Sequence, residues 1–347
     1  MPAAQDATRD ATDADGKVNA LANRFAAVLG PLLRQGEPFA LLDFPDHSNI
    51  GDSAIYAGEL AFLDAHAGRP ASYVCSHKTY RGDVDVFCPE GPILLHGGGN
   101  FGDVWPEFQA FRFDVLERHK GRPVIQLPQS IHFGDPAAIA DTARRIAAHG
   151  RFTLLVRDEP SLDLARRHFD CEVLLSPDAA YAMRRLPAKP ATRPILSLMR
   201  RDKEAVAQGG LEFLGDLGPV VDWEWPNWSQ WRKPIVPRMV EKVAGQSLPR
   251  SALVMRMREE VFRAQATALV SAGVEMLQPG RTIVSDRLHA HILSSLMRRP
   301  HVMLDNSYGK IARFIACWGD DSLARQVSGP DELRRVLGEL SEAAPAA

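Results

Sequence analysis

Short apolar runs alternate with longer amphipathic segments along most of the chain. In the first half, the apolar runs have the length of buried strands, and they lie at residues 40–44, 92–96, 124–127, 153–156 and 173–175. The amphipathic segments between them predict helices at residues 52–66, 106–120, 136–148 and 161–168. Strands that alternate with helices favour a parallel sheet covered by helices on both faces.

A proline-rich break at residues 186–194 separates this series from a second one. The break holds three prolines in nine residues, which is typical of an interdomain linker. After it, the pattern predicts strands at residues 195–199, 219–222, 282–284 and 301–304, and helices at residues 259–272 and 290–297. We therefore expect an α/β fold of two Rossmann-like domains that face a cleft, at residues 19–188 and 189–340.

The composition is that of an ordinary globular protein. Hydrophobic residues make up 45% of the 347 positions and charged residues 24%, which is enough apolar material for two cores. A formal net charge of −2 gives no electrostatic case for nucleic acid. No apolar run approaches the ~20 residues that span a bilayer. Residues 1–18 lack the basic start and apolar core of a signal peptide, so we expect a disordered leader there.

The most informative segment is residues 285–291, where a predicted strand turns into a predicted helix. A helix N-terminus presents free backbone N–H groups and favours anions. Arg287 adds a planar guanidinium that suits phosphate or carboxylate, and His289 adds a group that moves protons near neutral pH. The plainer alternative is a helix capped by its own serine or aspartate, with a buried histidine. Arg287 and His289 together predict an anion that is held beside an acid or a base. His291 is expected in a supporting position.

Three further polar or glycine-rich stretches follow predicted strands, where ligands collect in open α/β sheets. Residues 45–53 are small and polar, residues 96–103 contain a glycine run that a ligand can approach closely, and residues 199–202 hold paired arginines. Each could instead be a tight connection or a solvated surface. Neither glycine-containing stretch matches a dinucleotide or Walker motif. The candidate ligand-binding residues in these stretches are Asn49, Gly98, Gly99, Asn100, Arg200 and Arg201.

Two features outside these stretches are candidates for substrate contacts. Four of the six tryptophans fall within residues 223–231, interleaved with polar residues and a proline. Trp225 and Trp228 could stack on sugar rings, because pyranose faces pack against aromatic rings, although core packing is the usual role of tryptophan. Lys310 follows the strand at residues 301–304, and it either reaches an anion in the cleft or is solvated.

Six short segments form an ordered pattern that spans residues 40–318. They are NIGD at 49–52, LHGGGN at 95–100, VRDEPS at 156–161, SPDAA at 176–180, SDRLH at 285–289 and the stretch 305–310. This ordered set resembles the polysaccharide pyruvyl transferase family. The resemblance implies a fold of the glycosyltransferase-B type, with an acceptor domain at residues 19–188 and a phosphoenolpyruvate domain at residues 189–340.

The resemblance also implies an activity and donor-binding residues. The family transfers a pyruvyl group from phosphoenolpyruvate to two hydroxyls of a sugar, in an exopolysaccharide or its precursor, and so forms a ketal and releases phosphate. Arg287 and His289 match the arginine and histidine that contact phosphoenolpyruvate in the family. A further donor-binding arginine matches either Arg200 or Arg201.

The chemistry of ketal formation requires two proton transfers. One proton must reach the enol carbon of phosphoenolpyruvate, and a base must take a proton from the attacking hydroxyl. We expect His289 to perform one transfer and either Asp52 or Asp286 to assist with the other, while Arg287 and Arg200 clamp the donor. No metal or other cofactor is expected beyond phosphoenolpyruvate as co-substrate.

The expected partners are phosphoenolpyruvate and a saccharide or lipid-linked oligosaccharide acceptor. The four cysteines show no paired C-x-x-C spacing, which indicates neither a zinc site nor a disulfide framework and favours a reducing cytoplasm. A lipid-linked acceptor would bring the protein to the inner membrane face. The sequence leaves the acceptor sugar, the ketal stereochemistry and the oligomeric state open.

The strongest alternative function is that of a serine hydrolase of the GDSL type. Ser53, Asp286 and His289 imitate its catalytic residues. Eight residues separate Ser53 from Phe44, however, whereas a nucleophile should sit at the strand end. A glycosyltransferase that uses a nucleotide-sugar donor would suit the architecture equally well. A non-catalytic sugar-binding protein would use the tryptophans but would leave Arg287 and His289 without a role.

Overall fold

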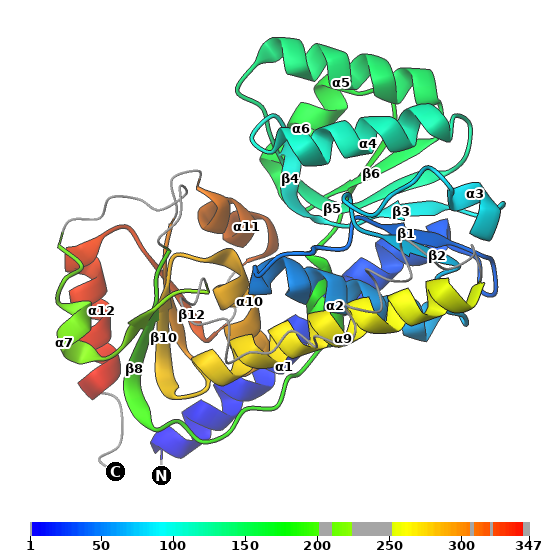
Figure 1. Cartoon of the computed structure of the whole chain (residues 1–347). Coiled ribbons are helices and arrows are strands. Elements are labelled where there is room, and N and C mark those ends of the chain that lie inside the picture. Colours follow the sequence, from blue (N-terminus) through cyan, green and yellow to red (C-terminus); the bar gives the residue numbers. More distant parts are fainter. Residues whose placement is uncertain (1, 201–209, 224–251, 306–308, 320–321, 343–347) are drawn as a thin grey trace.

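The computed structural model describes residues 2–200, 210–223, 252–305, 309–319 and 322–342, and these residues form two parallel β-sheets. Figure 1 shows one sheet formed by the first half of the chain and the other formed by the second half. The predicted α/β class with parallel sheets is therefore confirmed. The division into two domains that face a cleft stays a prediction, and so does the glycosyltransferase-B type.

The first sheet has seven strands, and most of them coincide with the predicted apolar runs. Six lie in the order β2 (Tyr73–Cys75), β1 (Ala40–Leu42), β3 (Ile93–Leu95), β5 (Val124–His132), β6 (Phe152–Val156) and β7 (Glu172–Leu175). The seventh, β4 (Gly98–Gly102), pairs in parallel with the second half of β5.

Strand β4 corrects the expectation that residues 96–103 form a loop. Gly98 and Gly102 have φ values of 132° and 127°, which other residues rarely adopt. A Cβ at Gly102 would overlap the carbonyl oxygen of His132 on β5. The glycine run therefore lets this backbone pack tightly against its neighbour strand.

Helices cover both faces of the first sheet (Figure 1). Three of the helices begin at a side-chain cap, because Asn49, Asp135 and Asp158 each accept a hydrogen bond from a backbone N–H two or three residues later. The helices are α2 (Ile50–His66), α3 (Val84–Phe87), α4 (Pro106–Arg118), α5 (Pro136–His149) and α6 (Glu159–His168), with short 3-10 turns η1 (Gly30–Leu32) and η2 (Ala179–Met183).

The second sheet has five strands and contains the weakly predicted strand near residue 220. Its order is β12 (Ala324–Val327), β11 (His301–Leu304), β10 (Gly280–Ser285), β8 (Arg193–Leu198) and β9 (Val220–Val221). The helices of this half are α7 (Leu214–Leu217), α9 (Ala252–Leu277), α10 (Leu288–Leu296), α11 (Lys310–Trp318) and α12 (Pro330–Glu342). Among the helices described, none is both long and apolar enough to cross a membrane.

Helix α1 (Pro2–Leu29) replaces the disordered leader that we expected at residues 1–18. Its apolar residues Val18, Leu21, Phe25 and Leu29 recur every three or four positions and are buried. Burial of this stripe stabilises the second half of α1, from residue 18 to residue 29.

Helix α9 is longer than predicted and joins the cores of the two sheets. Phe262, near its middle, is buried in the cluster that also holds Leu41 of β1. Leu269 and Leu277, further along, are buried with Ile283 of β10. The proline-rich break is therefore only one of the connections between the two halves, because α9 returns to the first sheet.

Candidate active site

The first part of the site is the N-terminus of helix α2. The Oδ1 of Asn49 accepts a hydrogen bond from the N–H of Gly51 at 3.0 Å, and its Nδ2 donates to the Oδ2 of Asp52 at 2.9 Å. The Nε2 of His47 lies 3.6 Å from the same carboxylate oxygen. One side chain, Asn49, thus caps the helix and also orients the carboxylate of Asp52.

The carboxylate of Asp52 is held in its ionised form. Burial acts to raise its pKa, but nearby positive charge outweighs burial, so the pKa lies below its ordinary value. The groups that lower it are His47, His289, His96 and Arg157. An ionised carboxylate of this kind is suited to accept a proton or a hydrogen bond from a hydroxyl.

His289 lies against this helix N-terminus, although it comes from the other half of the chain. A Cβ added to Gly51 would lie 2.5 Å from the Nδ1 of His289, so a side chain there would displace the imidazole. The Nε2 of His289 lies 3.4 Å from the Oδ2 of Asp178, and the His289 side chain is 12% exposed. The imidazole is therefore confined between α2 and a buried carboxylate, while part of it still reaches solvent.

Asp178 is shared between His289 and Arg157. The Nη1 of Arg157 donates to the Oδ2 of Asp178 at 2.5 Å, and its Nε donates to the Oγ of Ser130 at 2.9 Å. The Oδ1 of Asp178 accepts from the N–H of Ala180 at 2.9 Å. Burial acts to raise the pKa of Asp178, but the opposing effect of His289 and Arg157 is larger. The pKa therefore lies well below its ordinary value.

Sequence reasoning gave no role to Arg157 or Asp178. Arg157 follows strand β6 directly, and Asp178 follows strand β7 by three residues. The rule that selected the other stretches, that ligands collect beyond the carboxyl ends of strands, applies to both of them. They were missed because a single arginine and an aspartate that caps a short helix are also common structural features.

A buried histidine follows strand β3. The Nδ1 of His96 lies 2.8 Å from the Oε2 of Glu59, whose Oε1 accepts from the N–H of Gly97 at 2.8 Å. Burial acts to lower the pKa of His96, but Glu59, helped by Asp52 and Asp43, raises it above its ordinary value. The Nε2 of His96 is buried and has no hydrogen-bond partner among the residues described. His96 is thus a buried imidazole oriented by Glu59, and sequence reasoning did not single it out.

The predicted glycine-rich contacts lie in strand β4, beside this centre. A Cβ added to Gly98 would lie 3.8 Å from the Oδ1 of Asp52, so the glycine backbone approaches that carboxylate closely. Gly99 is the next residue of the strand. The Oδ1 of Asn100 accepts from the Nη2 of Arg112 at 3.1 Å. The structure therefore brings Asn49, Asp52, Gly98 and His289 together.

Arg287 and Asp286 form a separate cluster at the end of strand β10. The Nε of Arg287 donates to the Oδ1 of Asp222 at 2.7 Å, and its Nη2 lies 2.5 Å from the same oxygen. The N–H of Arg287 donates to the Oγ of Ser285 at 3.1 Å. The Oδ1 of Asp286 accepts from the N–H of Arg200 at 2.9 Å. The backbone of Arg200 therefore lies beside the segment that carries Arg287, and Arg287 forms a buried ion pair with Asp222 that the sequence did not indicate.

The same cluster changes the expected start of helix α10. The helix begins at Leu288, two residues earlier than predicted, and Arg287 occupies the N-cap position without a side-chain cap hydrogen bond. Burial raises the pKa of Asp286, while the N–H of Arg200 and the charges of Arg287 and Arg200 act in the opposite direction. Asp52 and Asp286 were the two candidates for the second proton transfer, in addition to His289. Charge lowers the pKa of Asp52 and favours its ionised form, whereas burial raises the pKa of Asp286 and favours its protonated form.

The four-residue spacing of Arg287 and His291 does not place them on one helix face. Arg287 has extended backbone angles, so the spacing rule for helices does not apply to it. The Nδ1 of His291 lies 2.7 Å from the Nε2 of His301, and its Nε2 lies 3.5 Å from the hydroxyl of Tyr181. His291 is therefore a buried residue with polar partners.

Four predicted substrate contacts cannot be placed. Arg201, Trp225 and Trp228 lie outside the described residues. Lys310 is the first residue of helix α11, but its side chain lies outside the description as well. Their roles stay predictions.

The geometry does not support the serine hydrolase. The Oγ of Ser53 is buried and has no hydrogen-bond partner among the residues described. Asp286 accepts from the N–H of Arg200, and His289 faces Asp178. A nucleophilic serine needs a base within hydrogen-bond reach, and that base needs an orienting partner. Neither relation links these three residues.

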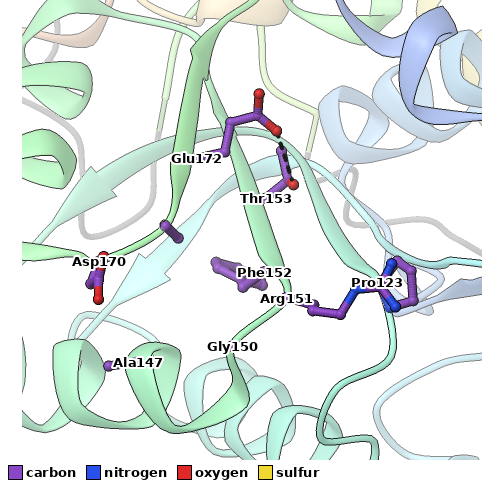
Figure 2. Close-up of a pocket in the computed structure, with 9 residues that line it drawn as sticks. Pro123, Ala147, Gly150, Arg151, Phe152, Thr153, Asp170 and Glu172 are labelled. Carbon is purple, nitrogen blue, oxygen red and sulfur yellow. Dashed lines mark hydrogen bonds between the residues drawn. The ribbon is translucent and has the colours of Figure 1, made fainter.

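A pocket of about 490 Å³ opens at the opposite edge of the first sheet (Figure 2). It lies at the starts of strands β6 and β7, where the Oγ1 of Thr153 donates to the Oε2 of Glu172 at 3.4 Å. Ligands in open α/β sheets collect at the carboxyl ends of strands, and this pocket is at the amino ends. We therefore assign it no part in the site.

Comparison with known proteins places these residues in a family. The sequence pattern of the polysaccharide pyruvyl transferases matches residues 49–308, which is most of the chain, and the protein belongs to this family. The match begins at the cap residue Asn49 and extends beyond His289, so it includes both halves of the site.

Individual relatives support the same assignment. Pyruvyl transferase 1 of Schizosaccharomyces pombe is 32% identical over 326 residues, which cover 88% of this chain and 76% of that protein. Putative pyruvyl transferase EpsO of Bacillus subtilis is 27% identical, over 88% of this chain and 92% of that protein. A crystal structure of a functionally uncharacterized protein from Klebsiella pneumoniae has a TM-score of 0.58 at 17% identity, over 89% of this chain and 99% of that chain. At that identity it supports the fold alone.

Proposed function

We propose that the protein transfers the pyruvyl group of phosphoenolpyruvate to two hydroxyls of a sugar and forms a cyclic ketal. Family membership supports a pyruvyl transferase with a saccharide acceptor. One geometric observation carries the rest: His289 of the second half lies 3.4 Å from Asp178 and against the α2 N-terminus that bears Asp52. A proton-carrying imidazole and an ionised carboxylate are what the two proton transfers need.

The reaction balances with these two groups. A proton added to the methylene carbon of phosphoenolpyruvate turns it into a methyl group and leaves an oxocarbenium centre at the adjacent carbon. The first sugar hydroxyl attacks that centre and gives up its proton. The bond between that carbon and the bridging oxygen of the phosphate then breaks, and the second hydroxyl closes the ketal. Of the two hydroxyl protons, one replaces the proton delivered to carbon and the other leaves with phosphate.

We assign the delivery of the carbon-bound proton to His289 and the acceptance of a hydroxyl proton to Asp52. Asp178, which stays ionised, holds His289 beside the reacting carbon. The carboxylate of Asp52 is ionised and oriented by Asn49, so it is prepared to act as the base. We assign the phosphate and carboxylate of the donor to Arg287, at the N-terminus of α10, and to Arg200, which follows β8.

Phosphate release tests this function. The protein is incubated with phosphoenolpyruvate and a panel of p-nitrophenyl hexopyranosides, and phosphate and the glycoside product are followed together. We expect phosphate release that depends on a glycoside, with a product heavier by one pyruvyl ketal. Release without any glycoside, or transfer only from a nucleotide sugar, would contradict the proposal. Loss of release in Arg287→Ala would connect the donor to the α10 cluster.

A further inference from the structure

The guanidinium of Arg112, on helix α4, is buried, and its hydrogen-bond partners among the residues described include no carboxylate. Arg112 is 2% exposed. Its Nε donates to the Oε1 of Gln126 at 2.7 Å, its Nη1 to the Oε1 of Gln109 at 2.5 Å, and its Nη2 to the Oδ1 of Asn100 at 3.1 Å. Its guanidinium carbon lies 4.5 Å from the ring centre of Phe101. Buried charges are usually paired, so an arginine held only by amide oxygens and a ring is unusual.

The charge of Arg112 persists despite its burial. Burial lowers the pKa of Arg112 to about 10, and Asp43 acts in the opposite direction. At neutral pH the guanidinium is therefore protonated, and all of its N–H groups are donors. The positive charge of Arg112 thus lies against Asn100 and Phe101 of strand β4.

This charge fixes the amide of Asn100 in one orientation. Its Oδ1 accepts from the Nη2 of Arg112 and, at 3.0 Å, from the Nε2 of Gln129. The N–H of Asn100 donates to the Oε1 of Gln129 at 3.2 Å, and the Nε2 of Gln129 also donates to the carbonyl of His96 at 3.1 Å. A guanidinium can only donate, so the amide cannot turn its NH₂ group toward Arg112. The Nδ2 of Asn100 is left facing away, and it has no hydrogen-bond partner among the residues described.

We propose that Arg112 is a positioning residue that holds the Nδ2 of Asn100 toward the site, where it donates to a hydroxyl oxygen of the acceptor sugar. Gly98, two residues earlier in β4, lies against the ionised carboxylate of Asp52. Gln129 also connects Asn100 to the carbonyl of His96, and the charge of His96 acts on the carboxylate of Asp52. A donor near a carboxylate suits a hydroxyl, which both accepts and donates, whereas the carboxylate would repel an anionic donor substrate. This inference rests on the proposed function.

The first test changes Asn100 itself. Asn100→Ala removes the donor, and Asn100→Asp keeps the shape and pairs with Arg112 but replaces the Nδ2 donor with an oxygen. We expect the KM for the p-nitrophenyl glycoside to rise about tenfold or more in both variants, with the KM for phosphoenolpyruvate within about twofold of wild type. A purely structural Asn100 predicts the opposite for Asn100→Asp, because the new ion pair would hold the strand and keep activity.

The second test asks whether Arg112 acts through Asn100. Arg112→Lys keeps the charge but cannot bond three amide oxygens in the same fork, so we expect the KM for the glycoside to rise about tenfold. In the double variant with Asn100→Ala, the rise should be no larger than in Asn100→Ala alone. Arg118→Lys, an exposed arginine of the same helix, is the matched control and should match wild type. Thermal unfolding of every variant separates loss of fold from loss of orientation.

The outcomes separate this inference from the proposed function. If the wild-type protein shows no glycoside-dependent phosphate release, the proposed function is wrong. If the wild type is active, three results each overturn the positioning role: an additive double variant, a rise in the KM for phosphoenolpyruvate instead of the glycoside, or an unchanged KM in Asn100→Asp.

Discussion

Two histidines of helix α10 lie two residues apart and have opposite environments. His289 faces the first half of the chain, with Gly51 on one side and the carboxylate of Asp178 on the other, and 12% of its side chain remains exposed. His291 is buried against His301. Because each residue of a helix turns by about 100°, positions two apart point to nearly opposite sides. The same residue type is thus a candidate proton carrier at position 289 and a packing residue two positions later.

The comparison shows that a histidine's surroundings decide its role. His289 meets a charged group that comes from another element and from the other half of the chain. His291 meets a second imidazole and the hydroxyl of Tyr181, and its bonds hold strand β11 and the turn η2 against the helix. Changes at His289 should therefore reduce turnover, and changes at His291 should reduce stability.

The largest effect is expected at His289. His289→Gln should lower kcat about a thousandfold, because it removes the group that we assign to proton delivery. The free energy of unfolding should change by less than about 1 kcal/mol, because the imidazole is partly exposed and lacks an ideal hydrogen bond. Phosphate release and thermal unfolding measure the two effects. His168→Gln, at an exposed position of α6, is the control, and an active His289→Gln protein would remove His289 from the mechanism.

Asp178→Asn should affect both activity and stability. It removes the charge that faces Arg157 and His289, and it leaves the buried guanidinium of Arg157 without its carboxylate. We expect kcat to fall about a hundredfold and the free energy of unfolding to fall by about 3 kcal/mol. Asp114→Asn removes an exposed pair with Arg118 and should leave the free energy of unfolding nearly unchanged, because solvent screens such pairs.

The stability effect of Asp178→Asn should depend on pH in a defined direction. The pKa of Asp178 in the folded protein lies below its ordinary value of 3.8. Its contribution to stability is therefore complete above about pH 5 and is lost as pH falls through 4 toward the folded pKa. The difference in unfolding free energy between wild type and variant should shrink in that range. Urea unfolding between about pH 3 and 7 measures it, and a constant difference would contradict the assigned ion pair.

A smaller effect is expected at Gly51. Gly51→Ala places a Cβ 2.5 Å from the Nδ1 of His289, so the ring must shift. We expect kcat to fall about tenfold, because displacing a catalytic group by a fraction of an ångström misaligns proton transfer. Gly338→Ala in α12 adds a methyl group where no atom lies within 4 Å, and it should leave phosphate release unchanged. Equal activity in both variants would place the reacting ring elsewhere.

The smallest effect on turnover is expected at His291. His291→Leu removes the hydrogen bonds to His301 and Tyr181, and a buried polar group that loses its partner costs about 1–3 kcal/mol. Turnover per folded molecule should stay within about threefold of wild type. Thermal unfolding and kcat, measured well below the midpoint of unfolding, test this. A large loss of kcat without loss of stability would reverse the roles of the two histidines.

Local sequence patterns predicted much of the fold and part of the site. The apolar runs, capping residues and break at residues 186–194 gave the strand and helix order, because periodicity and caps act over a few residues. Residues 2–18, where we expected a disordered leader, belong to helix α1, and most of the glycine-rich stretch at residues 96–103 forms strand β4. Asn49, Asp52, Gly98 and His289 were chosen at strand ends, and the fold brings them together.

The sequence by itself determined the α/β class, the order of the elements and the family, since each is written in short segments and their order along the chain. Only the tertiary structure decided which partners the key side chains meet. It placed Asp178 beside both Arg157 and His289, paired Arg287 with Asp222, and fixed Asn100 with Arg112. These contacts join residues that are far apart along the chain or on different elements, so no local pattern specifies them. Burial then makes each contact strong enough to orient the groups involved.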